Sequence, residues 1–156
     1  IDLLPGTGDA QLTLAQTLPL TGAVVVATPQ DVALSDVVRG VTMFRKLEVP
    51  VMGVIENMSY FVCPHCGERT DIFDHGGAHR MADKMGVSFL GEIPLDPKIR
   101  MGGDTGLPVS ITEPESALGQ AFKNLAQQVA AKISVLNAQA AQGELIAAGS
   151  IPIVKR

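Results

Sequence analysis

Three short runs of apolar residues stand out along the chain, and a polar or proline-containing turn follows each of them. The runs cover residues 23–27, 51–55 and 89–93. The first two lack the alternation of a half-exposed strand, which is the pattern of parallel strands covered on both faces. The sequence therefore predicts three strands of a parallel sheet.

Helical periodicity fills the segments between these runs. Apolar residues at spacings of three and four predict helices over 9–18, 32–47, 75–85 and 114–136. We expect Asp31 to cap the second helix and Gly86 to end the third. Strands that alternate with helices predict an α/β fold, a parallel β-sheet flanked by helices with ligands bound beyond the carboxyl ends of the strands.

The two ends of the chain differ from its middle. Residues 1–4 resemble the end of a strand whose first half lies outside this sequence. We expect one α/β domain over residues 1–136. The segment 137–156 is rich in Ala, Gln and Gly, and it is predicted to be either a disordered tail or a strand swapped onto a partner.

Composition and charge exclude several classes of protein. Twelve basic and 16 acidic residues give a net charge of −4, and aromatic residues make up 4% with no Trp. Such a chain lacks the positive field and the stacking surface typical of nucleic-acid binding. No apolar run reaches the roughly 18 residues that a membrane span needs. We therefore expect neither a nucleic acid nor a membrane as partner.

The most informative motif is Cys63-Pro64-His65-Cys66-Gly67, which lies in a hairpin-like insertion over about 58–74. Two cysteines three positions apart do not make a disulfide framework, and they favour a reducing compartment, here the cytoplasm. In a tight turn, both thiolates can bind one ion while backbone N–H groups stabilise the sulfurs.

A zinc ion or an iron–sulfur cluster takes four ligands, and this pair supplies half of them. The remaining ligands come either from a second copy of the chain, across a two-fold axis, or from the histidines His65, His75 and His79. His75 is otherwise expected to cap its helix, and His79 to lie on a solvated face. Thioredoxin-like redox chemistry and a pair of thiols without a function are the other interpretations.

Two further turns carry candidate binding residues. Asp2 follows the first apolar residue and precedes Gly6 and Gly8, an arrangement that suits Mg²⁺ held through water beside a phosphate. An ordinary strand–turn–helix corner is the competing interpretation.

Asn57 follows the second predicted strand, and Pro94, Leu95 and Asp96 follow the third. A carboxamide offers a donor and an acceptor together, which suits the edge of an adenine ring, and a proline loop can flank that ring. Alternatively, Asn57 satisfies only the backbone of its own turn.

Together these turns resemble the Mrp/ApbC family of iron–sulfur cluster carriers, which are deviant-Walker P-loop NTPases related to MinD and ParA. The resemblance covers residues 1–136 and is carried by the segments 2–9, 54–59, 63–67, 75–77 and 91–97. It implies that the chain is the C-terminal part of a P-loop NTPase fold. The C-P-x-C-G segment separates this family from its relatives.

The resemblance also implies roles for the candidate residues. Cys63 and Cys66 would hold half of a 4Fe–4S cluster that bridges a homodimer through the C-x-x-C region, for transfer to apo iron–sulfur proteins. In the family, ATP binding or hydrolysis is coupled to this carriage.

For the nucleotide site, the resemblance implies that Asp2 is the Mg²⁺-associated carboxylate and that Gly6 and Gly8 belong to a switch turn near the γ-phosphate. Asn57 would read adenine, and the base pocket would be lined by Pro94, Leu95 and Asp96.

Two departures from the family pattern bear on activity. The Gly-rich Walker A loop with its lysines does not occur in this sequence, so we expect this chain alone neither to bind ATP tightly nor to hydrolyse it. Leu4 stands where the family usually has Pro, which removes a φ constraint but no functional group.

The leading hypothesis is the C-terminal portion of an ATP-dependent iron–sulfur cluster carrier. The alternative is a MinD/ParA-like nucleotide-switch ATPase with a structural zinc knuckle. A thiol oxidoreductase is the least favoured, because nothing in the sequence places Cys63 at the N-terminus of a helix.

Overall fold

The computed structural model describes the backbone of residues 1–3 and 8–149 and the side chains of residues 1–3 and 8–140. Its centre is a sheet of three parallel strands in the order β1-β2-β5. These strands are β1 (Ala23–Ala27), β2 (Val51–Asn57) and β5 (Phe89–Ile93). The predicted parallel sheet is confirmed, and β2 runs two residues further than the apolar run because Glu56 and Asn57 stay paired to β5.

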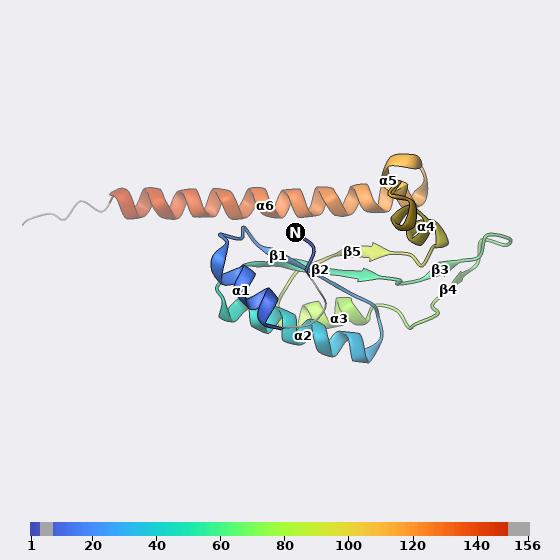
Figure 1. Ribbon diagram of the computed structural model, residues 1–156, viewed down its shortest axis with the longest axis horizontal. Helices are drawn as coiled ribbons and strands as arrows, with labels where there is room; N and C mark the ends of the chain where they lie inside the picture. The colour runs from blue at the N-terminus through green and yellow to red at the C-terminus, as the bar shows by residue number, and fades with distance from the viewer. Residues whose placement is uncertain (4–7, 150–156) are drawn as a thin grey trace, which may run out of the picture.

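Helices cover both faces of this sheet (Figure 1). The helices α2 (Asp31–Lys46) and α3 (Gly77–Met85) lie on one face, and α6 (Ala117–Gly149) lies on the other. The remaining helices are α1 (Asp9–Thr17), α4 (Pro97–Thr105) and α5 (Val109–Thr112). A short antiparallel hairpin of β3 (Phe61–Val62) and β4 (Arg69–Thr70) projects from the carboxyl end of β2.

Separate apolar clusters hold these layers together. On the α2–α3 face, Val41, Val54, Ala78 and Ala82 are completely buried. On the opposite face, Leu125 of α6 packs with β5 residues. Within the part of the chain that the structure describes, every helix is too short or too polar to cross a bilayer.

Several predicted boundaries were wrong. The N-cap of α2 is Gln30 rather than Asp31, which is the first helical residue, and no side chain caps this helix. The third helix ends at Gly86 in the left-handed conformation, as predicted, with φ of 62°. The last helix starts at Ala117, where the Ser116 hydroxyl accepts a hydrogen bond from the Gly119 N–H at 3.0 Å.

That last helix continues to Gly149 instead of ending at Leu136. Its Ala- and Gln-rich continuation lacks proline, and such residues extend a helix readily. The rest of the predicted tail, residues 150–156, lies outside the described residues. Residues 1–3, predicted as the end of a strand, adopt no regular secondary structure, and Leu4 lies outside the described residues.

Two glycines at the start of α3, the N-cap residue Gly76 and the first helical residue Gly77, allow its N-terminus to approach the rest of the fold. Gly76 adopts φ of 72°, a conformation that costs glycine little. A Cβ atom on Gly77 would lie 2.6 Å from the Pro29 carbonyl oxygen and 2.8 Å from Leu34 Cδ1. Because these distances are shorter than ordinary contacts, α3 can pack at this depth only with glycine there.

We therefore expect Gly77→Ala to lower the free energy of unfolding by about 1–3 kcal/mol through overpacking. The matched control is Gly103→Ala in α4, where a Cβ meets no atom within 4 Å and alanine should add roughly 0.5–1 kcal/mol. Urea unfolding of both variants measures the difference. Equal or greater stability for Gly77→Ala would show that the packing of α3 is misdescribed.

Candidate functional site

The C-x-x-C pair lies in the turn of the β3–β4 hairpin, which confirms the predicted hairpin-like insertion. The Cys63 N–H donates to the Glu68 carbonyl at 2.9 Å, and the Gly67 N–H donates to the Cys63 carbonyl at 2.8 Å. Gly67 adopts φ of 73°, which lets the turn close tightly. Both thiols are free; Cys63 is half-buried and Cys66 is exposed. The turn therefore presents two sulfur ligands toward solvent.

Backbone amides favour the charged form of one of these thiols. The N–H groups of Cys66 and then His65, with a smaller contribution from the Cys66 side chain, lower the pKa of the Cys63 thiol. Burial of the thiol raises its pKa, but this contribution is smaller than those of the hydrogen bonds. Hydrogen bonds to a thiolate stabilise it relative to the neutral thiol, so the turn is suited to binding a cation through sulfur.

The predicted base-binding residues come together at the carboxyl ends of neighbouring strands. Asn57 is paired in register with Ile93, and Pro94 follows directly. The Asn57 Oδ1 atom accepts a hydrogen bond from the Met58 N–H at 3.0 Å. The Asp96 carboxylate accepts one from the Lys98 N–H at 2.8 Å and caps α4. These side chains thus have local structural roles at the edge where ligands bind in such sheets.

A buried carboxylate, not singled out by sequence analysis, lies next to Asn57. Glu56 is 0% exposed, and its two oxygens accept hydrogen bonds from the Gly76 N–H at 3.0 Å and the Ala78 N–H at 2.8 Å. The Ser59 hydroxyl donates to Glu56 Oε1 at 2.5 Å. Glu56 therefore accepts hydrogen bonds from the first amides of α3, and the N-cap residue of this helix is Gly76. The prediction that His75 caps it was wrong.

His75 instead bridges the buried carboxylate and the hairpin. Its Nδ1 atom lies 3.0 Å from Ser59 Oγ, and an Arg69 guanidinium nitrogen lies 2.9 Å from Nδ1 and 3.2 Å from Nε2. The His75 ring thus lies between the Ser59 hydroxyl and the Arg69 guanidinium.

The other predicted site residues that the structure describes lie on several different elements. Asp2 is exposed and lines a groove of about 720 Å³ beside β1 and α2. Gly8 is the N-cap residue of α1, and Gly6 lies outside the described residues. His65 is exposed in the hairpin turn, and the His79 ring stacks on Phe89 with centroids 4.5 Å apart.

The sequence contains an indication that Glu56 is buried, although its local pattern does not reveal the hydrogen-bond partners of this side chain. A glutamate that continues an apolar strand must be buried, and a buried carboxylate requires donors. Two glycines after His75 make the backbone N–H groups of a helix start accessible. The sequence does not identify the two donors, the Gly76 and Ala78 N–H groups, because they lie 20 and 22 residues further along the chain.

Comparison with known proteins finds similarity to iron–sulfur cluster transfer and carrier proteins. The family described as ParA, NUBPL iron-transfer P-loop NTPase, matches residues 1–130. The chain is 53% identical over 136 residues to the iron–sulfur cluster transfer protein NUBPL of Dictyostelium discoideum, covering 87% of this chain and 42% of that protein. It is 50% identical over 133 residues to the iron–sulfur cluster carrier protein of Escherichia coli, covering 85% and 36%.

Solved structures show the same fold. A nucleotide-binding protein from Archaeoglobus fulgidus, solved with ADP, superposes with a TM-score of 0.60 at 39% identity, over 74% of this chain and 46% of that one. The cell-division ATPase MinD of Pyrococcus furiosus gives 0.56 at 28% identity, over 70% and 42%.

The chain spans less than half the length of these curated relatives, between 36% and 42%. The family match nevertheless covers most of this chain, including β1, β2, β5 and the C-x-x-C hairpin. The chain belongs to the ParA family of P-loop NTPases, in its NUBPL-type iron-transfer branch.

Proposed function

We propose that this chain carries an iron–sulfur cluster on Cys63 and Cys66 and passes it to apo-proteins. The observation that carries the proposal is the turn itself, in which two free thiols share one exposed loop and backbone N–H groups lower the pKa of Cys63. Iron and zinc bind thiolate rather than thiol. The printed names of the relatives, cluster transfer and cluster carrier proteins, support iron–sulfur cargo.

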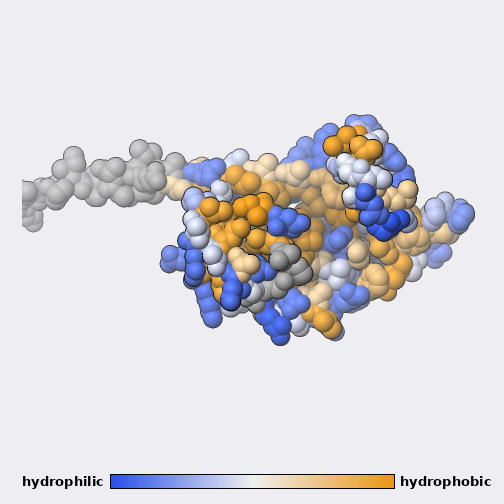
Figure 2. All heavy atoms as spheres, viewed as in Figure 1, coloured by the Kyte–Doolittle hydropathy of each residue, from blue (hydrophilic) through white to orange (hydrophobic). Residues whose placement is uncertain are grey.

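A second copy of the chain is the proposed source of the remaining ligands. Of the three histidines, His75 contacts Ser59 and Arg69, and the His79 ring stacks on Phe89. Their present contacts would have to break before either could bind the cargo. Because the hairpin projects from the body of the molecule, two copies can approach one another at the cysteines (Figure 1). The tip of the hairpin is hydrophilic (Figure 2). We infer a 4Fe–4S cluster shared by a homodimer.

We further propose that nucleotide binds at the carboxyl ends of β2 and β5 in the longer family members. Asn57, Pro94, Leu95 and Asp96 would surround the base, and Asp2 would hold Mg²⁺ through water. The sequence lacks a Walker A loop, whose amides and lysine carry most phosphate binding. ATP hydrolysis coupled to cluster transfer is thus proposed for longer proteins that include that loop, with Gly6 and Gly8 near the γ-phosphate.

The alternative function is a nucleotide switch of the MinD kind with zinc in the same knuckle. The fold is similar to that of MinD structures, which supports this alternative. Tetrahedral zinc also binds thiolates of this kind. Stoichiometric zinc in protein purified without added metal, together with a failure to take up iron, would support this alternative. A cytoplasmic location stays a prediction, because the name of one relative, from Arabidopsis thaliana, describes that protein as mitochondrial.

Anaerobic reconstitution with iron and sulfide should load about four iron and four sulfide per two chains. Cys63→Ser and Cys66→Ser should each abolish loading, because serine replaces a thiolate by a much weaker ligand for iron. Metal and sulfide analysis measures both effects.

His65→Ala is the matched control for this experiment, because it changes the same turn without removing a thiol. Loading should persist in His65→Ala if a second copy supplies the missing ligands. Normal loading of either serine variant would contradict the proposed function, and loss of loading in His65→Ala would contradict the homodimer.

The lowered pKa of Cys63 gives a second prediction, in the metal-free Cys66→Ser variant with Cys63 as its one thiol. A thiolate forms as pH rises through the pKa, so the pH profile of alkylation should lie at lower pH than that of an unstructured cysteine peptide. His65→Pro in the same background removes one of the amide N–H groups responsible and should shift the profile back to higher pH. A profile for the Cys66→Ser variant that coincides with the free peptide would show that the turn does not stabilise the thiolate.

A further inference from the structure

We propose that Arg69 is a positioning residue that fixes the C-x-x-C hairpin to the carboxyl end of β2. We call its contacts with Tyr60, His75 and Glu92 the Arg69 clasp. This inference rests on the proposed function, because it assigns to the clasp the task of holding the cluster ligands in place.

The hairpin needs an anchor because it is very small. Each of its strands has two residues, and an isolated two-stranded hairpin is marginally stable in water. The polypeptide leading into β3 is fixed by backbone bonds, from the Ser59 N–H to the Ile93 carbonyl at 3.0 Å and from the Leu95 N–H to the Tyr60 carbonyl at 2.7 Å. The second strand is attached through the Arg69 side chain.

Arg69 is well placed for this attachment. Its guanidinium carbon lies 4.0 Å from the centre of the Tyr60 ring. One terminal nitrogen lies 2.9 Å from His75 Nδ1, 3.2 Å from His75 Nε2 and 4.0 Å from the Glu92 carboxylate. The planar guanidinium thus contacts β5, the segment before α3 and the residue before β3 at once, a geometry for which arginine is suited and lysine is not.

The clasp ends on a rigid, buried group. The Arg69 guanidinium contacts the His75 ring, His75 Nδ1 lies 3.0 Å from Ser59 Oγ, and the Ser59 hydroxyl donates to Glu56. Glu56 is held in turn by two backbone amides at the start of α3. The buried end of this network, Glu56 with Ser59, is fully hydrogen-bonded and so specifies one geometry. The contacts from Arg69 therefore position β4 relative to the end of β2 and to Asn57.

The same geometry disfavours a metal ion at this place. Glu56, His75 and Glu92 bring ligand atoms within 4.8 Å of one another, which is a spacing a cation could use. The Arg69 guanidinium contacts His75 and Glu92 of this group, and both Glu56 oxygens already accept hydrogen bonds. Arginine therefore supplies the positive charge here, and the group serves the hairpin.

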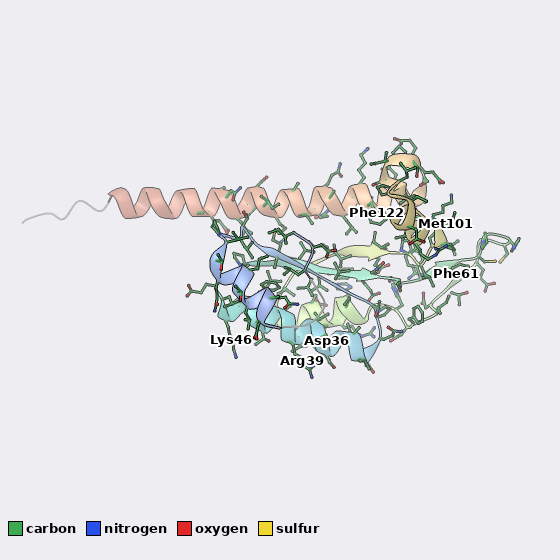
Figure 3. The ribbon with its side chains drawn as sticks, in the orientation of Figure 1. Asp36, Arg39, Lys46, Phe61, Met101 and Phe122 are labelled. Atoms are coloured by element: carbon green, nitrogen blue, oxygen red, sulfur yellow. The ribbon has the colours of Figure 1, made fainter. Side chains whose placement is uncertain are left out.

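Hydrogen exchange in the metal-free chain tests the clasp directly. The reporter is the Cys63 amide, which donates to Glu68 across the hairpin. Arg69→Gln should speed its exchange about tenfold, and Arg69→Lys should not restore protection, because an ammonium group lacks the planar fork. The control is Arg39→Gln, an exposed arginine on α2 paired with Asp36 and remote from Phe61 of the hairpin (Figure 3).

A double variant separates the clasp from general destabilisation. If Arg69 acts through His75, the combination of Arg69→Gln with His75→Ala should exchange no faster than the more affected single variant, since coupled changes are not additive. Additive effects would overturn the proposed connection. Unchanged exchange in Arg69→Gln would overturn the clasp altogether.

Cluster retention supplies the functional readout. Changing a group that orients metal ligands typically weakens metal binding by about 10- to 100-fold, so the Arg69→Gln dimer should lose its cluster to a chelator faster by a factor in that range. If the Cys63 amide of Arg69→Gln exchanges at the rate of the parent and the variant retains its cluster equally long, the proposed clasp is wrong while the proposed function stands. If exchange speeds up but the parent never loads a cluster, the clasp stands as a hairpin anchor and the proposed function fails.

Discussion

The burial of the Glu56 carboxylate is the constraint on which the functional end of this fold depends. A charged group without solvent contact must be matched by donors, and the donors here come from the start of α3 and from Ser59. These bonds bring α3 against the end of β2. They also orient His75, through which the network reaches the C-x-x-C hairpin.

The site divides into a rigid part and an exposed part. The ends of β2 and β5 belong to the sheet and hold Asn57 beside Pro94 with backbone pairing. The hairpin turn lies beyond the sheet and presents Cys63 and Cys66 to solvent. Such exposure suits the proposed transfer of a cluster to another protein, and the rigid edge suits the proposed nucleotide pocket. In this account, the Arg69 clasp joins the two parts.

Much of the fold could be predicted from the sequence because its strands are uninterrupted apolar runs and its cysteine turn is a compact motif. The end of β2 could not be predicted, because Glu56 and Asn57 are polar yet remain paired with β5 in the sheet. The helix α4 was missed because Gly102 and Gly103 suggest a loop, although Asp96 and Pro97 start it well. The clasp could not be predicted, since Glu56, Arg69 and Glu92 come from distant segments and their contacts depend on the folded sheet.

The central claim is that one pair of thiols per chain holds half of a cluster and that a second copy holds the rest. The most direct measurement is sedimentation of the anaerobically loaded chain, followed at the visible absorbance of the cluster. The account predicts that the coloured species sediments with twice the 16.4 kDa mass of one chain and that the colourless, unloaded chain remains smaller. A coloured species with the mass of a single chain would contradict it.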